Sequence, residues 1–486
     1  MSDVSQLGSP REGFFSYLFF LGLVFDMPKN LSKQARKQQS RIAALNTLGT
    51  PASSRAGSEL EDELDTLSEA SFATADSTGE IDETRLEDTL RRQIDDLGEK
   101  RTATRETALG TLNQMLAHHY CGPFLGSNQS NLSALLQLLI RSVRKPGSTQ
   151  ETILALKGIG LAFLSQEAGA GGEQDDYYGL VLPLLKNLVL TAVECDVKYQ
   201  AIETLAMVTF LAASHADTMG GLDFFYKILI SQGDNLRSED EDTKLSNKEM
   251  HTLMDASTRA YGLLYASAFG DGRGTYEDAW DEWQAVMPAH LDLLEHSSKD
   301  VRVAAGENIA LMFECTDTLK KQQVVEEDEQ EDEDQIPDYE EMDELIDALQ
   351  RLATDSSKKV NKQDRKEQRG AFRDIIRTVE SNERPKETLR FGRFRLVFRG
   401  WANILELRAF RHWLGQGLVR HFHDNDTVYS VFARTVNESS DSEGEADTED
   451  GPTAFEEEGS ENVMVSKNDV AARREKAKRI RKVKGH

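Results

Sequence analysis

The chain has 486 residues, of which 29% are charged, and its formal net charge is −27 at a mean hydropathy of −0.52. These values exclude a chain that is folded core throughout, so we expect solvated segments beside a folded region. Three cysteines, Cys121, Cys195 and Cys315, lie far apart in apolar helical contexts. This spacing favours three reduced, buried thiols over a disulfide framework or a zinc site.

The first feature in chain order is an apolar stretch, FFSYLFFLGLVF, at residues 14–25. It is too short to span a bilayer comfortably, and it lacks a clear charged flank and a small-residue cleavage site, which leaves a weak signal peptide as the alternative. Met27 opens a second start that is basic and soluble. We interpret residues 1–26 as an upstream or mis-assigned start, and we expect no membrane partner.

The rest of the N-terminal region is rich in Ser, Thr, Asp and Glu, as in GSELEDELDTLSEASFATADSTGEIDE. It contains too few large apolar side chains to offset the entropy lost when a chain becomes ordered. We predict a disordered region over 1–97, with a helix beginning near Leu86.

An internal period runs through residues 98–322. Five helical stretches can be aligned on a small residue, and the steps between these residues are 47, 46, 59 and 45. The long step contains a polar insertion at 231–249, which we expect to be a surface loop. A period of this length with paired helices is typical of armadillo or HEAT repeats. The five anchor residues are Ala108, Ala155, Ala201, Ala260 and Ala305.

Small anchors let helices approach closely, and apolar residues three or four positions on supply a face that only a neighbouring repeat can bury. Partner helices are predicted at 131–143, 178–193, 222–231 and 279–296. The chain is therefore predicted to be all-α, an armadillo/HEAT-like α-solenoid, with an irregular helical bundle as the alternative. In Asp196-Val197-Lys198 and Asp300-Val301-Arg302 we expect the acid to cap a helix and the base to face outward.

Charge divides the remainder of the chain. We predict an acidic linker at 323–341, a C-terminal helical domain at 342–432, an acidic disordered linker at 433–465 and a basic tail helix at 466–486. Ser440 and Ser442 in the second linker each precede an acid by three residues, a pattern that acidophilic kinases favour. Phosphorylation there would let the linker compete with RNA for the tail.

No catalytic constellation is evident in the sequence. GDGRG at 270–274 lacks the preceding strand and the following Lys-Ser/Thr of a phosphate loop, so we predict a turn. His421 and His423 are spaced to point to different faces of a helix, which does not favour a metal site. We expect no enzyme, no cofactor, no metal and no small-molecule substrate.

Two basic segments are the candidate RNA-binding sites. The first precedes an apolar helix face and could bind phosphates, or it could be a solvated face that the acidic run before it neutralises. Its residues are Lys358, Lys359, Lys362, Arg365, Lys366 and Arg369. The second is the tail, whose basic residues are Arg473, Arg474, Lys476, Lys478, Arg479, Arg481, Lys482 and Lys484.

Three stretches carry a family resemblance: DVRVAAGENIALMFE (300–314), NKQDRKEQRGAFRDIIRTVE (361–380) and ETLRFGRFRLVFRGWANILELRAFRHWLGQGLVRHF, which follows. They resemble the interferon-related developmental regulator family over about residues 90–432 and the basic tail. The acidic linker at 326–341 is longer than the family leads us to expect, and residues 1–26 have no recognised counterpart. The resemblance implies an armadillo-like N-terminal domain, a short family-specific C-terminal domain and no enzymatic activity.

The resemblance also implies two alternative functions. Family members are linked to binding of translationally inactive ribosomes, with a basic C-terminal helix in RNA channels, and to nuclear co-regulation of transcription with deacetylase corepressors. The first predicts a cytoplasmic protein whose tail enters ribosomal RNA. The second predicts chromatin or corepressor partners, with the tail as a nuclear localisation signal.

Overall fold

The computed structural model describes residues 83–127, 129–166, 173–237, 245–327, 342–354, 362–391 and 394–432. The chain divides into two units, and all described residues lie in the second, Ala52–His486. The first element among the described residues, α3 (Glu83–Asp96), occupies the end of the region predicted to be disordered, and its Leu90 is buried. The predicted acidic linker at 433–465 and the basic tail lie outside the described residues.

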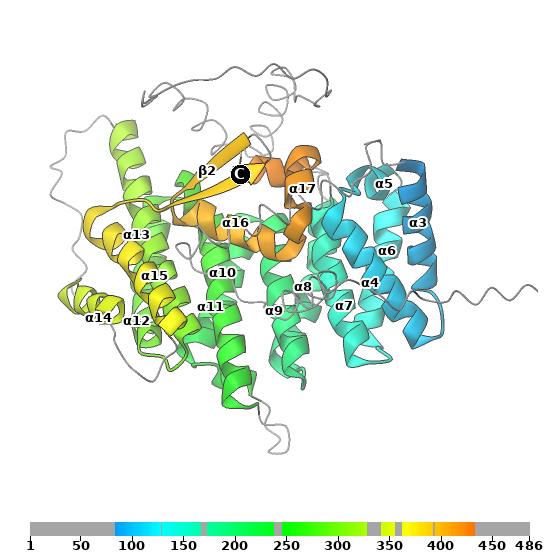
Figure 1. Ribbon diagram of the computed structural model, residues 1–486, viewed down its shortest axis with the longest axis horizontal. Helices are drawn as coiled ribbons and strands as arrows, with labels where there is room; N and C mark the ends of the chain where they lie inside the picture. Colours follow the sequence, from blue (N-terminus) through cyan, green and yellow to red (C-terminus); the bar gives the residue numbers. More distant parts are fainter. Residues whose placement is uncertain are drawn as a thin grey trace, which may run out of the picture. The chain divides into compact units, whose positions relative to one another are not determined.

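Two rows of helices make up the fold (Figure 1). In the first, here called the anchor row, each helix packs against the next. Its members are α4 (Thr102–His118), α7 (Thr149–Leu164), α9 (Cys195–Ala212), α11 (Asn247–Phe269), α13 (Lys299–Glu327) and α15 (Lys362–Ser381). The partner row supplies one helix to each: α3, α6 (Gln129–Arg144), α8 (Glu173–Thr191), α10 (His215–Ile230), α12 (Tyr276–Leu294) and α14 (Met342–Thr354). The all-α, solenoid-like fold is thus confirmed.

The five anchor alanines lie on five successive helices of the anchor row, and each is at most 4% exposed. Gly262 on the same row serves the same purpose. A Cβ added at Gly262 would lie 2.1 Å from Oδ1 of Asn308, whose amide donates to the Thr258 carbonyl at 2.8 Å. The small residues therefore allow the close helix approach that the repeat period predicted.

Hydroxyl side chains begin several of the helices. Ser148 accepts a hydrogen bond from the Glu151 amide at 3.0 Å at the start of α7. Ser246 and Glu249 form a complete capping box at the start of α11. These contacts satisfy amides that a helix leaves free in its first turn, which fixes where each helix begins.

The base in the repeated Asp-Val-Lys/Arg motif does not face outward as predicted. Lys198 is 2% exposed, and its Nζ donates to the carbonyls of Val189 and Leu190 at the end of α8, at 3.0 and 2.6 Å. Arg302 donates in the same way to the His296 carbonyl after α12, at 2.7 Å. Each base therefore satisfies carbonyls at or just beyond the end of its own partner helix.

Two boundaries differ from those expected. Helix α13 continues to Glu327, into the segment predicted as an acidic linker. Helices α14 and α15 were assigned to a separate C-terminal domain, but they pack together as a further pair, and α15 packs on α13. The acidic run at 328–341 lengthens the sequence interval before this pair. The pair therefore does not follow the nearly constant repeat period, and the period did not predict it.

Residues 386–399 form a β-hairpin within the segment predicted to be a helical domain. Strands β1 (Lys386–Phe391) and β2 (Phe394–Arg399) pair antiparallel. Leu and Phe recur at every second position in much of their sequence, which is the period of a half-buried strand. The prediction of an entirely helical C-terminal domain is therefore wrong over these residues.

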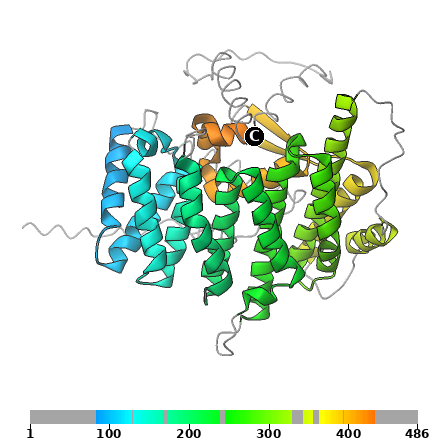
Figure 2. The same ribbon diagram turned by 180° about the vertical axis from the view of Figure 1, so that it is seen from behind.

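Residues 400–432, here called the strap, lie across the anchor row. They include α16 (Trp401–Leu414) and α17 (Leu418–Asp424), which Figure 1 shows in front of that row and Figure 2 shows from behind. At one end Glu314 of α13 accepts from the Trp401 amide at 2.9 Å. Towards the other, the Asn425 amide donates to the Leu164 carbonyl of α7 at 2.8 Å.

The oxidation state and burial of the cysteines agree with the prediction only in part. All three thiols are free, and Cys121 and Cys315 are buried, but Cys195 is only half-buried. Among the described residues, no helix has the length and apolarity needed to cross a membrane.

Candidate nucleic-acid interface

Helix α15 carries a line of basic side chains, here called the basic stripe: Lys366, Arg369, Arg373 and Arg377. The spacings of three and four residues place these positions on one face of the helix. At 1.5 Å per residue the stripe extends for about 16 Å. Lys366 and Arg373 are exposed, and the side chain of Arg377 is 48% exposed.

The opposite face of α15 holds the helix in the core. Phe372 and Ile375 are fully buried, and both lie against Gly306 of α13, where an added Cβ would come within 2.9 Å of each side chain. Packing on this face directs the basic stripe away from α13. Its orientation therefore follows from the amphipathic pattern of the helix.

The acids at the start of α15 are engaged with α13. Lys299 of α13 lies 3.2 Å from Asp364 and 3.1 Å from Glu367. Burial alone would lower the pKa of Lys299, but its hydrogen bonds to Glu367 and Asp364, together with the charge of Asp300, outweigh burial and raise that pKa. Because these carboxylates already face a cation, they neutralise the basic stripe less than the sequence suggests.

The ion pairs that Arg377 forms are weak. Arg377 lies 3.7 Å from the half-buried Asp374 and 4.0 Å from the exposed Glu383, and its own side chain is 48% exposed. Exposed pairs of this kind contribute about 0–1 kcal/mol. The stripe can therefore exchange them for the phosphates of a nucleic acid at little cost.

The structure brings part of the first predicted RNA-binding segment together. Lys366 and Arg369 lie in the stripe, and Arg365 is half-buried beside it. Lys362 begins α15, but its side chain, like Lys358 and Lys359, lies outside the described residues. So do all the predicted tail residues from Arg473 to Lys484, and Ser440 and Ser442.

Arg373 and Arg377 were missed by sequence reasoning. The apolar pattern obscured them, because Phe372 precedes Arg373 directly and Ile375 and Ile376 lie between the two arginines. Extending the helical spacing from Lys366 would have found both.

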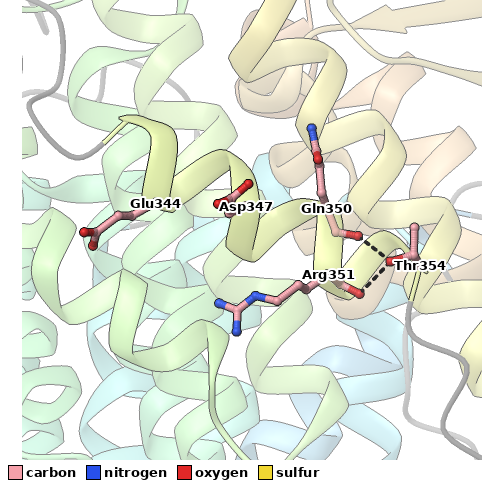
Figure 3. Close-up of a pocket in the computed structure, with 5 residues that line it drawn as sticks. All are labelled: Glu344, Asp347, Gln350, Arg351 and Thr354. Atoms are coloured by element: carbon pink, nitrogen blue, oxygen red, sulfur yellow. Dashed lines mark hydrogen bonds between the residues drawn. The ribbon is translucent and has the colours of Figure 1, made fainter.

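A hollow beside α14 offers no comparable site (Figure 3). It is lined by Glu344, Asp347, Gln350, Arg351 and Thr354. The Thr354 hydroxyl donates within α14, to the Gln350 carbonyl at 2.8 Å and to the Arg351 carbonyl at 3.2 Å. Arg351 pairs with Glu295 at 3.2 Å. Thr354 and Arg351 are therefore engaged locally, and the five side chains do not converge on a common point (Figure 3).

The histidines near the end of the strap have structural contacts. His421 is buried, with Nε2 3.1 Å from the Leu116 carbonyl, whereas His423 is exposed beside Asp424. The two rings occupy different environments, as their spacing predicted. Within the described ranges, no cluster of three or more His, Cys, Asp or Glu side chains suited to a metal ion is present.

The fold and the basic stripe define a helical-repeat protein with a line of basic residues on one face of α15. The chain belongs to the interferon-related developmental regulator family, whose model matches residues 52–380. The family resemblance is thereby confirmed, and membership indicates a regulatory role.

Relatives from distant organisms cover much of the chain. Interferon-related developmental regulator 2 of Mus musculus is 27% identical over 348 residues, which are 71% of this chain and 73% of the relative. Interferon-related developmental regulator 1 of Homo sapiens is 26% identical over 358 residues, 71% of each chain. A Schizosaccharomyces pombe protein without an assigned function is 25% identical over 346 residues, 68% of this chain and 71% of that one.

Proposed function

We propose that the protein is a non-enzymatic regulatory scaffold that binds ribosomes through ribosomal RNA and modulates translation in the cytoplasm. The basic stripe of α15 is the observation that carries this proposal. The basic tail would supply a second contact by entering an RNA-lined channel, as the family resemblance implies.

The acidity of the chain is compatible with RNA binding at the stripe. The net charge is −27, but charges on exposed surfaces are screened over about 8 Å at physiological salt. Locally the stripe presents four bases, and nearby acids at the start of the helix pair with Lys299. Arg and Lys in such a line release counterions when they bind phosphates, which favours association.

Charge reversal of the stripe tests the proposal. In the variant K366E/R373E/R377E we expect the protein to leave the ribosomal fractions of a sucrose gradient, whereas the parent co-sediments and is released by high salt or RNase. A matched control, R144E/K145E/K248E, reverses three exposed bases far along the chain from the stripe and should behave like the parent. Full co-sedimentation of the stripe variant would contradict an RNA contact at α15.

The tail is tested separately. Reversing the charges from Arg473 to Lys484, with an unrelated import signal appended, should abolish ribosome co-sedimentation if the tail enters RNA. If the variant sediments normally, the tail serves another purpose, and nuclear co-regulation through chromatin or corepressor proteins becomes the better explanation.

A further inference from the structure

The large hydrophobic side chains that the described residues expose gather on two helices of the partner row. They are between 37% and 60% exposed and are here called the apolar patch: Leu180, Leu190, Val193 and Ile230. Leu180 and Leu190 belong to α8, Val193 follows its end, and Ile230 is the last residue of α10. Single exposed hydrophobic residues are ordinary, but a group confined to one surface marks an interaction site.

The two helices that carry the patch lie side by side. Lys186 of α8 donates to the Gly220 carbonyl of α10 at 3.4 Å, and its Nζ lies 5.3 Å from the centre of the Phe224 ring. Because α9 runs back between them, α8 and α10 point in the same direction and end at the same edge of the partner row. The patch is therefore one surface that extends from α8 to the end of α10.

The outward face of α8 carries no charge. Between Tyr177 and Val193 the only charged residue is Lys186, and it is turned towards α10. The exposed residues of this face include Leu180, Pro183, Asn187, Leu190 and Thr191. The core is supplied by the opposite face, where Val181, Leu185 and Val189 are fully buried. Packing of the repeats therefore does not require the outward apolar residues.

The rim of the patch is mainly acidic. Burial lowers the pKa of Lys186, and the charges of Asp223 and Asp217 on α10 oppose that shift, which places both acids near the patch. Two exposed acids, Glu194 and Asp196, follow Val193 in the chain. An occupant that complements this surface is apolar on one side and basic on the other.

The basic tail of this chain has that pattern. In a helix its apolar residues would share one narrow side: Val470, Ala477, Ile480 and Val483. Eight Lys or Arg lie between Arg473 and Lys484, with Glu475 as the only acid among them. The apolar side extends over 13 residues, or about 20 Å, as does the segment from Leu180 to Val193. A helix with so narrow an apolar side is poorly stable alone in water.

The tail is attached within reach of the patch. The strap is fixed where the chain leaves α7 for α8, since the Thr427 hydroxyl donates to the Gln166 carbonyl at 3.2 Å. Residues 433–469 separate the strap from Val470. A flexible chain of this length has a root-mean-square span of about 33 Å, and α8 itself is about 28 Å long. Tethering gives the tail an effective concentration of about millimolar, so even weak docking is populated.

A second copy of the chain is a less suitable occupant. It would bring a further net charge of −27. In a symmetric contact the same patch of each copy faces the other, so the two acidic rims would lie together. The tail supplies an apolar side and the opposite charge.

We propose that the basic tail, residues 466–486, docks as a helix on the apolar patch when the protein is not bound to RNA. A docked tail cannot enter an RNA-lined channel, so the patch and the RNA compete for the same segment. This regulation rests on the proposed function, in which the tail contacts ribosomal RNA. Docking on its own rests on the patch, its rim and the tether.

Photo-crosslinking in the full chain tests the docking. A photoreactive phenylalanine derivative in place of Leu190 should join a peptide from residues 466–486 of the same molecule, identified by mass spectrometry of the monomer fraction. The additional change I480S/V483S should abolish this product, because it removes apolar contacts and keeps all eight bases. A crosslink between two copies, or the absence of any crosslink to the tail, would overturn the proposal.

Affinity for purified ribosomes without messenger RNA tests the competition. The variant L180Q/L190Q/V193Q should bind about three- to tenfold more tightly than the parent, since docking withholds part of the tail population from RNA. The control T252Q/A285Q changes exposed positions on α11 and α12 and should match the parent. Equal or weaker binding by the patch variant, at an unchanged melting temperature, would refute competition. If that variant unfolds, the crosslink and its loss in I480S/V483S decide.

The two measurements separate this proposal from the proposed function. If the intramolecular crosslink forms but neither the parent nor the patch variant binds ribosomes, docking is supported and the proposed function fails. If both proteins bind ribosomes equally and no crosslink forms, the proposed function is supported and docking fails.

Discussion

Single polar side chains join the strap to the repeats through backbone carbonyls. His421 is fully buried, and its Nε2 must carry a proton because it lies 3.1 Å from the Leu116 carbonyl, which can only accept. Nδ1 is then free to accept from the Asn425 amide at 3.3 Å. Burial lowers the pKa of His421 to about 4, so the neutral ring is the form that the fold stabilises.

Acid should therefore weaken the fold through His421. The unfolded chain binds a proton near pH 6.5 and the folded chain only near pH 4, so stability falls as pH decreases between these values. Relative to H421Q, the parent should lose about 2 kcal/mol between pH 7 and pH 5. Urea unfolding of both proteins at the two pH values measures this. An equal pH dependence in both would show that His421 does not titrate as described.

Individual elements show what the sequence could and could not predict. The helices of the repeats were predicted because their small anchors recur at a nearly constant period. The inward direction of the Lys198 side chain was not predicted. Its acceptors are carbonyls at the end of α8, and this contact forms only when the two helices pair. The hairpin was missed although its period-2 alternation was visible between Pro385 and Gly400. Arg373 and Arg377, half of the basic stripe, were not predicted because the apolar residues of this helix dominated its interpretation.

The buried base at the end of α8 predicts a specific loss of stability. Lys198→Met keeps much of the side-chain volume but removes the donor to two carbonyls. Leaving such groups unsatisfied should cost about 1–3 kcal/mol in the free energy of unfolding. Lys227→Met is the control, because Lys227 is exposed and pairs with the exposed Asp223, and it should change stability by less than about 0.5 kcal/mol. Equal effects in the two variants would rule out a capping role.

At the scale of the whole described unit, the strap changes how the repeats cooperate. Helices in a repeat stack contact only their neighbours, so distant repeats are coupled weakly. The strap contacts α4, α7, α11 and α13 in one continuous segment. Its residues are far in sequence from the helices that they cover, and no local pattern marks such a contact, so it could not be predicted from the sequence.

Trp413 is where this coupling can be tested. The Trp413 side chain is 3% exposed and packs directly on Gly160 of α7. A Cβ at position 160 would lie 2.3 Å from its ring, so the contact requires a glycine there. Trp413→Ala should lower the free energy of unfolding by about 3–5 kcal/mol. Because the strap contacts helices from α4 to α13, amide exchange should accelerate in α4 and α7 as well as in the strap.

Trp280→Ala provides the matched control, since Trp280 packs on Trp283 within the partner row. It should accelerate exchange near α12 and leave α4 unchanged. Faster exchange confined to the strap in Trp413→Ala would mean that the strap only covers the repeats. Acceleration of α4, α7 and the strap together would mean that residues 400–432 hold the repeats as one cooperative unit. In that case, a partner that displaced the strap would loosen the repeats that it covers.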